Sequence, residues 1–598
     1  MSKNIKVILF ALILLLSNAC SDDFLQINDP NSPTSSTFYS SLSNAQNAVT
    51  GVYAGFFSGD QLYFGEIFYI LMYSTGEALY VHPESRYTDF NNYNYSSTNT
   101  LIAGYYQQWY NIVGRANNVI QGLRTMQQSG NYTGDDLTQL HYMLGQCYFL
   151  RGLAYSNLVR SFGERMPSNP DYTPDLPGVE LVDTVITQRE QMYKGRSSCG
   201  EVYNSVVKDF KLAESLLPTS WIAAEAGKAT KGSAQAYLGE TYVYLQKWDS
   251  AKIAFDKILE NPQYSLVSNF SHNFNYKYIN NSESLFEVGF NNLVIGSGYG
   301  TSIYRLLALQ SWGTSIVPTS TIDKFSSSVV INSQTLAAAL TAKNSVVGSV
   351  QKGYVDDLIS ISNSFIGQSF DSKEAFLNAI ASLTNIPFYK PDGITYQNGV
   401  KAFLNAVSPK DPRLASTVFT PKIDSIVVFN PTTTRWSKKL FDFSNYGIKK
   451  YIPDSVEVDN AQAAGMGNDG LISQNFRIMR LDDVYLYYAE VMHHLNQDVI
   501  ANEYLNKLVR RANGLPINTP SAVDLSPTDI MKEIIHQTYL ETCLEGKIWF
   551  HYRRWNIANQ EWAQYGYKAN KNECLPIPQT EFDSNTGLHL PADQNPGY

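Results

Sequence analysis

Acidic and imidazole side chains are the groups in this chain whose spacing could support hydrolytic or metal chemistry. Glu283 and Glu287 lie four residues apart and have the chemical type of a glycosidase acid and nucleophile. The chain contains 54 acidic residues, so one such pair is a weak signal, and solvated surface positions are expected for both. His493 and His494 are adjacent on a predicted helix, where neighbouring side chains face different ways, so they are not expected to share a metal ion.

Other sequence signatures of catalysis are absent. The sequence contains no phosphate loop of the form G-x-x-x-x-G-K-[ST], no H-E-x-x-H zinc motif and no G-x-S-x-G nucleophile elbow. The glycine-rich stretch GSGYG at 296–300 is interpreted as a turn. We therefore predict no catalytic residue, no metal site and no cofactor, and expect a binding protein rather than an enzyme.

The N-terminus has the pattern of a secretory signal that ends at a lipidation site. Lys3 and Lys6 precede an apolar run, Val7 to Leu16, which is shorter than the ~20 residues that cross a bilayer. Small and polar residues follow, and then Cys20. A cysteine placed in this way is diacylated in bacterial lipoproteins, and its acyl chains anchor the protein. We predict a signal peptide at residues 1–19 and lipidation of Cys20; the alternative is an ordinary signal peptide with an incidental cysteine.

Composition indicates a globular chain of 598 residues with 44% hydrophobic and 17% charged residues. Its net charge of −9, without a basic cluster, argues against binding to nucleic acids. Tyr outnumbers Phe, 41 to 29, and this surplus favours half-exposed recognition surfaces, because Tyr joins an apolar ring to a polar tip. Four cysteines are expected to be free thiols in packed helices, with a disulfide as the alternative; they are Cys147, Cys199, Cys543 and Cys574.

Helical periodicity sets the expected architecture. Residues 231–262 predict two short amphipathic helices in which small residues, Gly239 and Ala251, allow close approach, as in a tetratricopeptide repeat. A looser copy spans 482–511, and further helices are predicted over 142–159 and 198–217. Residues 262–475 are rich in Ser, Asn, Gly and Tyr and predict loops, short hairpins and a few short helices. Two alternating runs in this region are expected to be strands: 285–290 and 426–429.

Six short motifs follow one another along the chain. They are FLRG (149–152), DPRL (411–414), RLDDVYLYYAE (480–490), LNKLVRRANGLP (505–516), LPIPQTEF (575–582) and the final QNPGY. In this order, after a lipoprotein-type signal, they resemble the SusD/RagB family of outer-membrane nutrient-binding lipoproteins. The segment around Glu545 departs from the family's pattern, which puts its local ion pairs in doubt. The family's usual Glu-Arg pair, Glu-Leu pair, Arg and Asp are replaced here by Gln537-Thr538, Glu541-Thr542, Ile548 and His551.

The resemblance implies a mainly α, SusD-like fold. Tetratricopeptide-type helix pairs would pack against an irregular, loop-rich region with a few short β-hairpins. It also implies a SusD-like N-terminal region over 20–260 and a C-terminal region over 261–598 that carries the ligand-binding loops and the final repeat helices. Asp22 and Asp23 resemble the short acidic signal that sends such lipoproteins to the outer face of the outer membrane.

The function implied by the resemblance is capture without catalysis. Members cover a SusC-like TonB-dependent transporter and bind an oligosaccharide or polysaccharide for import. Three alternatives remain: a peptide-capturing lid of a RagAB-like system, a glycoside hydrolase, and a tetratricopeptide adaptor.

The resemblance also indicates two neighbourhoods for the ligand, because family aromatics that contact ligand come from comparable places. The first is a helix-poor stretch around 80–91 and the second is 299–312. Flat aromatic rings with polar neighbours suit a sugar, which offers an apolar C–H face and hydroxyls. The predicted ligand-binding residues are Tyr80, His82, Arg86, Tyr87, Asp89, Asn91, Tyr304, Arg305 and Trp312.

Overall fold

The computed structural model describes most of the chain after residue 37. The described residues are 38–57, 67–290, 315–326, 328–370, 373–391, 396–408, 410–430, 435–452 and 474–598. The predicted signal peptide, Cys20, and the stretch with Tyr304, Arg305 and Trp312 lie outside them. Within the described residues the fold is mainly helical, as predicted, and none of the helices there has the length and apolarity needed to cross a bilayer.

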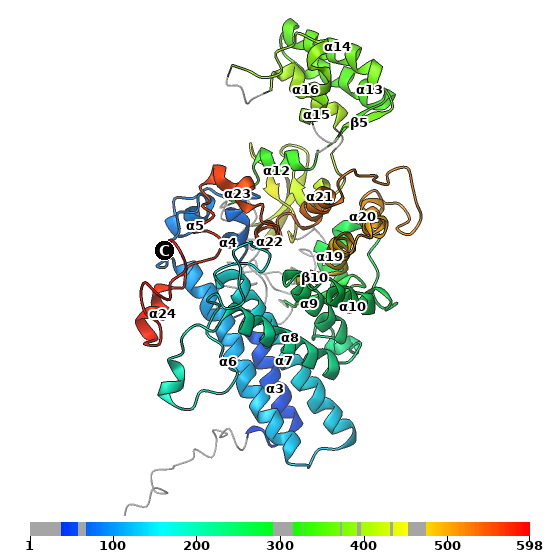
Figure 1. Cartoon of the computed structure of the whole chain (residues 1–598). Helices are drawn as coiled ribbons and strands as arrows, with labels where there is room; N and C mark the ends of the chain where they lie inside the picture. The colour runs from blue at the N-terminus through cyan, green and yellow to red at the C-terminus, as the bar shows by residue number, and fades with distance from the viewer. Residues whose placement is uncertain are drawn as a thin grey trace, which may run out of the picture.

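Long helices form one end of the body (Figure 1). They are α3 (Leu42–Tyr53), α6 (Thr100–Gln128), α7 (Gly134–Phe162) and α8 (Cys199–Leu216). The second half of α7 is buried on all sides, which its nearly continuous apolar and small residues permit. Gly152 lets α8 approach closely, since a Cβ there would stand 3.0 Å from the ring of Phe210. A capping box between Ser198 and Glu201 begins α8.

Two helical hairpins lie where the sequence predicts pairs of short amphipathic helices. The first is α9 (Lys231–Tyr244) with α10 (Trp248–Leu259), and the second is α19 (Leu481–His494) with α20 (Asp498–Ala512). The hairpins contact each other although they are far apart in the sequence. The ring of Phe255 stacks on that of Tyr487, with centroids 6.1 Å apart, and the Tyr488 hydroxyl donates to Asp256 at 2.7 Å.

Gly239→Ala is expected to destabilise the protein by about 1–3 kcal/mol, because a Cβ at this position would overlap the ring of Phe255 across the α9–α10 contact. Gly114→Ala is the matched control. Position 114 lies inside α6 with no atom within 4 Å of a Cβ, so helix propensity alone should stabilise it by about 0.5–1 kcal/mol. Urea unfolding of the two variants should therefore give changes of opposite sign; equal changes would contradict the packing argument.

The described strands form two-stranded antiparallel sheets. The predicted strands are confirmed as β2 (Ser284–Val288), which pairs with β10 (Phe476–Arg480), and β7 (Ser425–Asn430), which pairs with β8 (Arg435–Leu440). Two smaller sheets lie nearby: β1 (Leu79–Tyr80) with β3 (Ser315–Ile316), and β6 (Val418–Phe419) with β9 (Gly447–Ile448). Val317 donates to the Tyr446 carbonyl at 3.0 Å and so links these two sheets.

The short helices expected within residues 262–475 are present, but the packing of those over 329–407 into a helical lobe was not foreseen from the sequence. The lobe contains β4 (Val329–Ile331), α13 (Ser333–Ala342), α14 (Ser349–Ser362), β5 (Gln368–Phe370), α15 (Lys373–Ile380) and α16 (Asn398–Val407). It has its own core, separate from that of the body, in which Val355, Leu358, Phe376 and Phe403 are fully buried.

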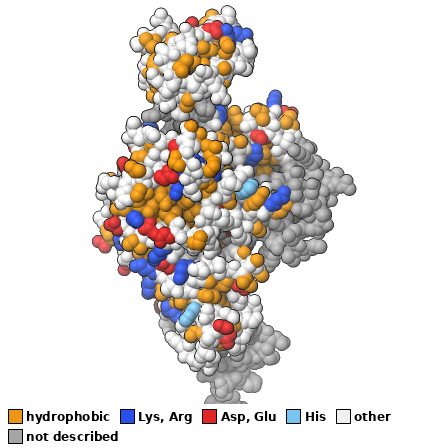
Figure 2. All heavy atoms as spheres, turned by 90° about the vertical axis from the view of Figure 1, so that its right-hand side faces the viewer, with side chains coloured by type: hydrophobic (Ala, Val, Ile, Leu, Met, Phe, Trp, Pro, Cys, Tyr) orange, Lys and Arg blue, Asp and Glu red, His pale blue; other side chains and the backbone are white. Residues whose placement is uncertain are grey.

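The lobe lies at one end of the molecule, beyond the body (Figures 1 and 2). At its base the backbone amide of Asp411 donates to the carbonyl of Phe325 at 2.8 Å. The chain therefore enters and leaves the lobe at neighbouring points. On the body side, Phe325 lies just after α12 (Thr319–Lys324), and Asp411 precedes the buried Arg413.

The remaining helices complete the body. They are α4 (Ile67–Ser74), α5 (Ser85–Asn91), α17 (Leu414–Thr417), α21 (Ile530–Thr542), α22 (Ile548–Arg554), α23 (Ala558–Trp562) and α24 (Gln579–Ser584). One continuous apolar core runs from Ala45 to Leu588 and joins the N-terminal helices to the C-terminal motifs. The four cysteines named above are buried free thiols, as expected.

Candidate ligand-binding site

The structure places the first predicted ligand segment beside the first described residues that follow the second segment in the sequence. β1 pairs with β3, so Tyr80 lies opposite Ser315, the first described residue after the second segment. The Tyr73 hydroxyl, from α4, hydrogen-bonds the Ser315 hydroxyl at 2.5 Å and fixes this junction from below. Only two residues separate Trp312 from Ser315 in the sequence.

The first segment is less helix-poor than predicted, because residues 85–91 form α5. This helix ends at Asn91, whose side chain holds β1 by its backbone. The Tyr80 amide donates to Asn91 Oδ1 at 3.1 Å, and Asn91 Nδ2 donates to the Tyr80 carbonyl at 2.8 Å. Asn91 was predicted to bind ligand; the structure uses its amide to position β1.

The rings of this segment form one cluster. The Tyr80 and Tyr87 rings lie 4.6 Å apart, and the Tyr73 ring meets Tyr80 edge-on at 5.7 Å. The Arg86 guanidinium lies over the Tyr87 ring at 4.6 Å, a cation–π contact, and the His82 ring lies 6.2 Å from Tyr80.

Exposure divides this cluster into a floor and a rim. Tyr80 and Tyr87 are only 4% and 8% exposed, whereas His82 and Arg86 are exposed. Asp89 is half-buried. A ligand would therefore contact the exposed rim, and the buried tyrosines hold the rim residues in place. We call these residues, Tyr80, His82, Arg86 and Tyr87, the Tyr80 cluster.

The electrostatics of the cluster favour hydrogen bonding over proton transfer. Burial and the nearby Glu84 together raise the pKa of Tyr80 to about 12, so the phenol stays neutral. Burial also raises the pKa of Asp89, against a hydrogen bond from Asn94 that lowers it. Arg86 pairs with Glu84 at 3.5 Å, and both are half-exposed, so the pair is weak and a ligand can compete for it.

Sequence reasoning missed the residues that support the cluster. Tyr73 lies in an apolar helical run and has no local signal other than that of a core residue. Glu77 is 1% exposed and precedes β1; its carboxylate accepts from the Leu544 amide at 2.7 Å and from the Thr75 hydroxyl at 2.6 Å. Glu77 therefore ties the base of β1 to the loop before α22.

Because of Glu77, the free energy of unfolding should fall as pH rises. Burial raises its pKa from 4.5 to about 7, so between these values the folded protein keeps a proton that the unfolded chain loses. The stabilisation is complete below pH 4.5 and is lost as pH passes 7, to a total of roughly 3 kcal/mol. Glu77→Gln, which can keep both hydrogen bonds, is expected to be more stable than the parent at pH 8 and similar at pH 4.5.

The measurement is urea unfolding of both proteins at several pH values. Exposed Glu190 provides the control, and Glu190→Gln should follow the parent curve throughout. If Glu77→Gln also ran parallel to the parent, the assigned titration would be wrong.

Glu283 and Glu287 are not at the surface, and this prediction was wrong. Both are at most 2% exposed and are held in ion pairs: Glu283 with Arg511 at 3.2 Å, and Glu287 with Arg477 at 3.1 Å. Asn273 also donates to Glu283 at 2.9 Å. Burial raises the pKa of Glu283 to about 7, while Arg511 opposes the rise. Both carboxylates are engaged by structural partners, Glu283 by Arg511 and Asn273 and Glu287 by Arg477 and Asn475, rather than by solvent.

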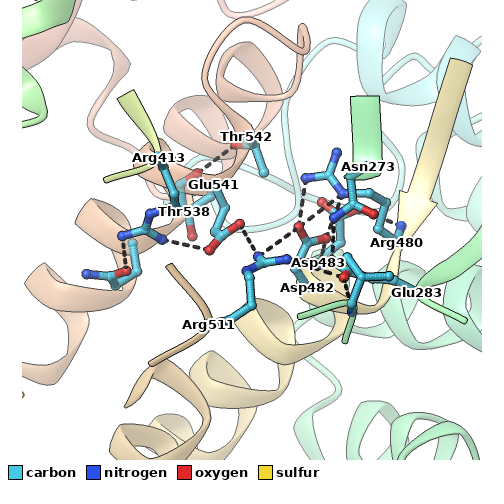
Figure 3. A network of polar contacts seen from close by, with 12 residues as sticks. Asn273, Glu283, Arg413, Arg480, Asp482, Asp483, Arg511, Thr538, Glu541 and Thr542 are labelled. Atoms are coloured by element: carbon cyan, nitrogen blue, oxygen red, sulfur yellow. Dashed lines mark hydrogen bonds and ion pairs between the residues drawn. The ribbon is translucent and has the colours of Figure 1, made fainter. Parts of the chain in front are cut away.

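Glu283 belongs to a buried network of charges (Figure 3). Arg511 also contacts Glu541 at 2.6 Å, and Glu541 contacts Arg413 at 2.7 Å. Arg480 pairs with Asp482 at 2.8 Å, and all these side chains have no exposed surface. The arginines lower the pKa of Asp482 against its burial. The network joins β2, α17, β10, α19, α20 and α21.

The segment that departs from the family pattern keeps its ion pairs. Gln537 accepts from Arg413 at 2.8 Å beside Glu541, and Glu545 pairs with Arg480 and with Lys450. Burial alone would raise the pKa of Glu545, but the neighbouring cations lower it to about 2.

The two adjacent histidines have separate roles, as expected. His493 contacts Asp498 at 2.7 Å, and His494 stacks on Trp248 with ring centroids 4.0 Å apart. In the described part of the chain no three His, Cys, Asp or Glu side chains gather in a way that could hold a metal ion.

Comparison with known proteins matches both ends of the chain. The model of the SusD family matches residues 388–598, and a second model, described as starch-binding associating with outer membrane, matches residues 23–245. The chain is 24% identical to SusD-like protein P2 of Formosa agariphila, over 99% of both chains. It is 21% identical to a SusD-like protein of Bacteroides ovatus, over 98% of this chain and 91% of the relative.

Solved structures show the same fold. A SusD superfamily protein from Bacteroides vulgatus superposes with a TM-score of 0.63 and 21% identity, covering 92% of this chain and 99% of that one. A laminarin binding SusD-like protein gives a TM-score of 0.63 and 20% identity, covering 93% and 99%. Matched models at both ends, relatives over the full length and a shared fold lead to one conclusion: the chain belongs to the SusD/RagB family.

Proposed function

We propose that this protein is a cell-surface glycan-binding lipoprotein. It captures an oligosaccharide or polysaccharide and delivers it to a SusC-like TonB-dependent transporter, held on the outer membrane through lipidated Cys20. The names of its relatives support this role: one matched model is described as starch-binding associating with outer membrane, and one similar structure binds laminarin.

The observation that carries the proposal is the β1–β3 pairing, in which Tyr80 of the first segment lies opposite Ser315, three residues after Trp312 in the sequence. A sugar ring would lie against aromatic surface from 299–312, including Tyr304 and Trp312. His82 and Arg86 at the rim, with Arg305, would hydrogen-bond its hydroxyls. Tyr80, Tyr87, Asp89 and Asn91 support these groups from below. No proton transfer or covalent step is needed, so the proposed protein is a binder and not an enzyme.

Affinity gel electrophoresis of the chain in a panel of polysaccharides, including laminarin and starch, tests this proposal. At least one polysaccharide is expected to retard migration, and chromatography should show that it is left uncleaved. Retardation by none, together with calorimetric binding of peptides, would favour the peptide-capturing alternative. Release of shorter oligosaccharides would favour the hydrolase.

A further inference from the structure

A polar pocket of about 230 Å³ lies at the start of α9, where the loop before this helix meets the turn before β2. Its rim is exposed and carries Ser220, Gln263, Asn280 and Ser282. Water occupies ~30 Å³ per molecule, so the pocket holds about seven waters. It is smaller than the ~300–1,000 Å³ pockets of drug-sized ligands, which points to a ligand of one ring. None of its lining residues belongs to the Tyr80 cluster.

The charges that face this pocket are already neutralised. Of the described residues that line it, Lys228 and Glu287 are charged. Lys228 pairs with Glu225 at 3.1 Å. Glu287 pairs with Arg477 at 3.1 Å and accepts from Asn475 Nδ2 at 2.9 Å. Lys228 also lies over the Trp221 ring, 5.1 Å from its centroid. A charged ligand would have to compete with these partners, so a neutral ligand is favoured.

The N-terminus of α9 does not act as an anion site in this pocket. Thr230 and Ser233 form a capping box, which uses backbone donors of the first turn. The Tyr264 ring packs on Gly232, where a Cβ would overlap it, and the Tyr264 hydroxyl hydrogen-bonds the Thr230 hydroxyl at 3.2 Å. The helix end is thus covered by an aromatic ring.

What remains in the wall is a mixture of aromatic surface and neutral hydrogen-bonding groups. Trp221 is half-buried and rigidly held: its Nε1 donates to the Ala229 carbonyl at 2.8 Å, and its ring meets Tyr142 edge-on at 5.5 Å. The side-chain amides of Gln263 and Asn280 and the hydroxyls of Ser220 and Ser284 supply donors and acceptors. The other polar side chains of the wall are held by protein partners: Thr230 by Ser233 and Tyr264, Asn281 by Asn273 and the Glu283 amide, and Ser282 by the Ser265 carbonyl.

Gly227 and Asn280 face each other across the mouth of the pocket. Gly227 has φ +95°, a conformation that favours glycine, and a Cβ there would make an ordinary van der Waals contact with Asn280 Oδ1 at 3.7 Å. Asn280 itself has φ 50°, a left-handed conformation that Asn tolerates, and its amide donates to buried Glu287 at 3.0 Å. The turn that carries Asn280 is therefore fixed before any ligand arrives.

We propose that this pocket, which we call the α9 pocket, binds a single neutral sugar ring, either a free monosaccharide or the end of a chain. The C–H face of the ring would lie on Trp221 or Tyr264, and its hydroxyls would bond Gln263, Asn280 and Ser284. The α9 pocket is a second site, independent of the Tyr80 cluster and of the proposed function.

Saturation-transfer difference NMR of the full chain, titrated separately with glucose, galactose, mannose, xylose and N-acetylglucosamine, tests the proposal. At least one sugar should bind. Gln263→Trp, which places an indole at the exposed rim, should raise its dissociation constant by about tenfold or more. Gln334→Trp is the matched control on the exposed surface of α13 and should bind like the parent.

A variant of the proposed glycan site separates the two proposals. His82→Ala, Arg86→Ala and Trp312→Ala together should leave monosaccharide binding unchanged if the α9 pocket holds the sugar. Binding that survives Gln263→Trp, or that disappears with the triple variant, would overturn the α9 pocket, and so would the absence of binding by all five sugars. None of these outcomes depends on whether polysaccharide gels retard the protein, so the two proposals can fail separately.

Discussion

Replacing Arg511 with Met is expected to lower the free energy of unfolding by about 3–5 kcal/mol, because it leaves buried carboxylates without their counter-ion. Arg511 lies between Glu283 and Glu541, at 3.2 and 2.6 Å, and none of the three side chains is exposed. Glu541 keeps Arg413, but Glu283 keeps only hydrogen bonds, from Asn273 and the Val267 amide. Urea unfolding followed by circular dichroism measures the change.

Lys343→Met is the control for this prediction. Lys343 pairs with Asp356 at 2.6 Å, but the two side chains are 28% and 49% exposed, so its loss should cost no more than about 1 kcal/mol. The double variant Arg511→Met with Glu283→Gln should recover part of the loss, because the uncompensated charge is removed. Equal effects of Arg511→Met and Lys343→Met would show that the buried network does not govern stability.

The triple variant His82→Ala, Arg86→Ala and Trp312→Ala is expected to weaken polysaccharide binding by about 30-fold or more, since binding hot spots lose ~2 kcal/mol or more on truncation. His82 and Arg86 are exposed, so their truncation should not disturb folding. Tyr80 is left intact because it is 4% exposed and its loss would disrupt the ring cluster. Calorimetry with the polysaccharide that retards the parent gives the affinity.

Trp248→Ala is the aromatic control for this variant. Trp248 is half-buried on α10, where it stacks on His494, and it belongs to the helical hairpins rather than to the Tyr80 cluster. Its loss should leave polysaccharide affinity within about threefold of the parent, less than 1 kcal/mol. If the triple variant bound polysaccharide as tightly as Trp248→Ala, the proposed glycan site at His82, Arg86 and Trp312 would be rejected.

The helical hairpins could be predicted because their signal is local. Gly239 and Phe255 are sixteen residues apart and meet across one tight turn, so small and large residues at fixed spacing report the packing directly. The lobe was missed because its helices are separated by polar turns. Even so, Val400, Phe403, Leu404 and Val407 in α16 follow helical spacing, and a periodicity count over this segment would have found it.

The candidate site was predictable only in part, because contacts between distant residues leave no local pattern. The segment around Tyr80 could be found by its aromatic and polar composition, but not the division into buried floor and exposed rim. That division depends on Tyr73 and Ser315, 242 residues apart. The same reason explains the error for Glu283 and Glu287, whose partners Arg511 and Arg477 lie about two hundred residues away.

The hydrogen bond between Phe325 and Asp411 makes the lobe an interchangeable module. Because both crossings of the chain lie side by side and the lobe has its own core, splicing Ser326 to Lys410 through a short glycine linker would remove it without opening the body. A calorimetric scan of the intact protein should accordingly show two melting transitions, and the spliced protein one. The lobe can therefore be removed or replaced through a single pair of neighbouring chain crossings.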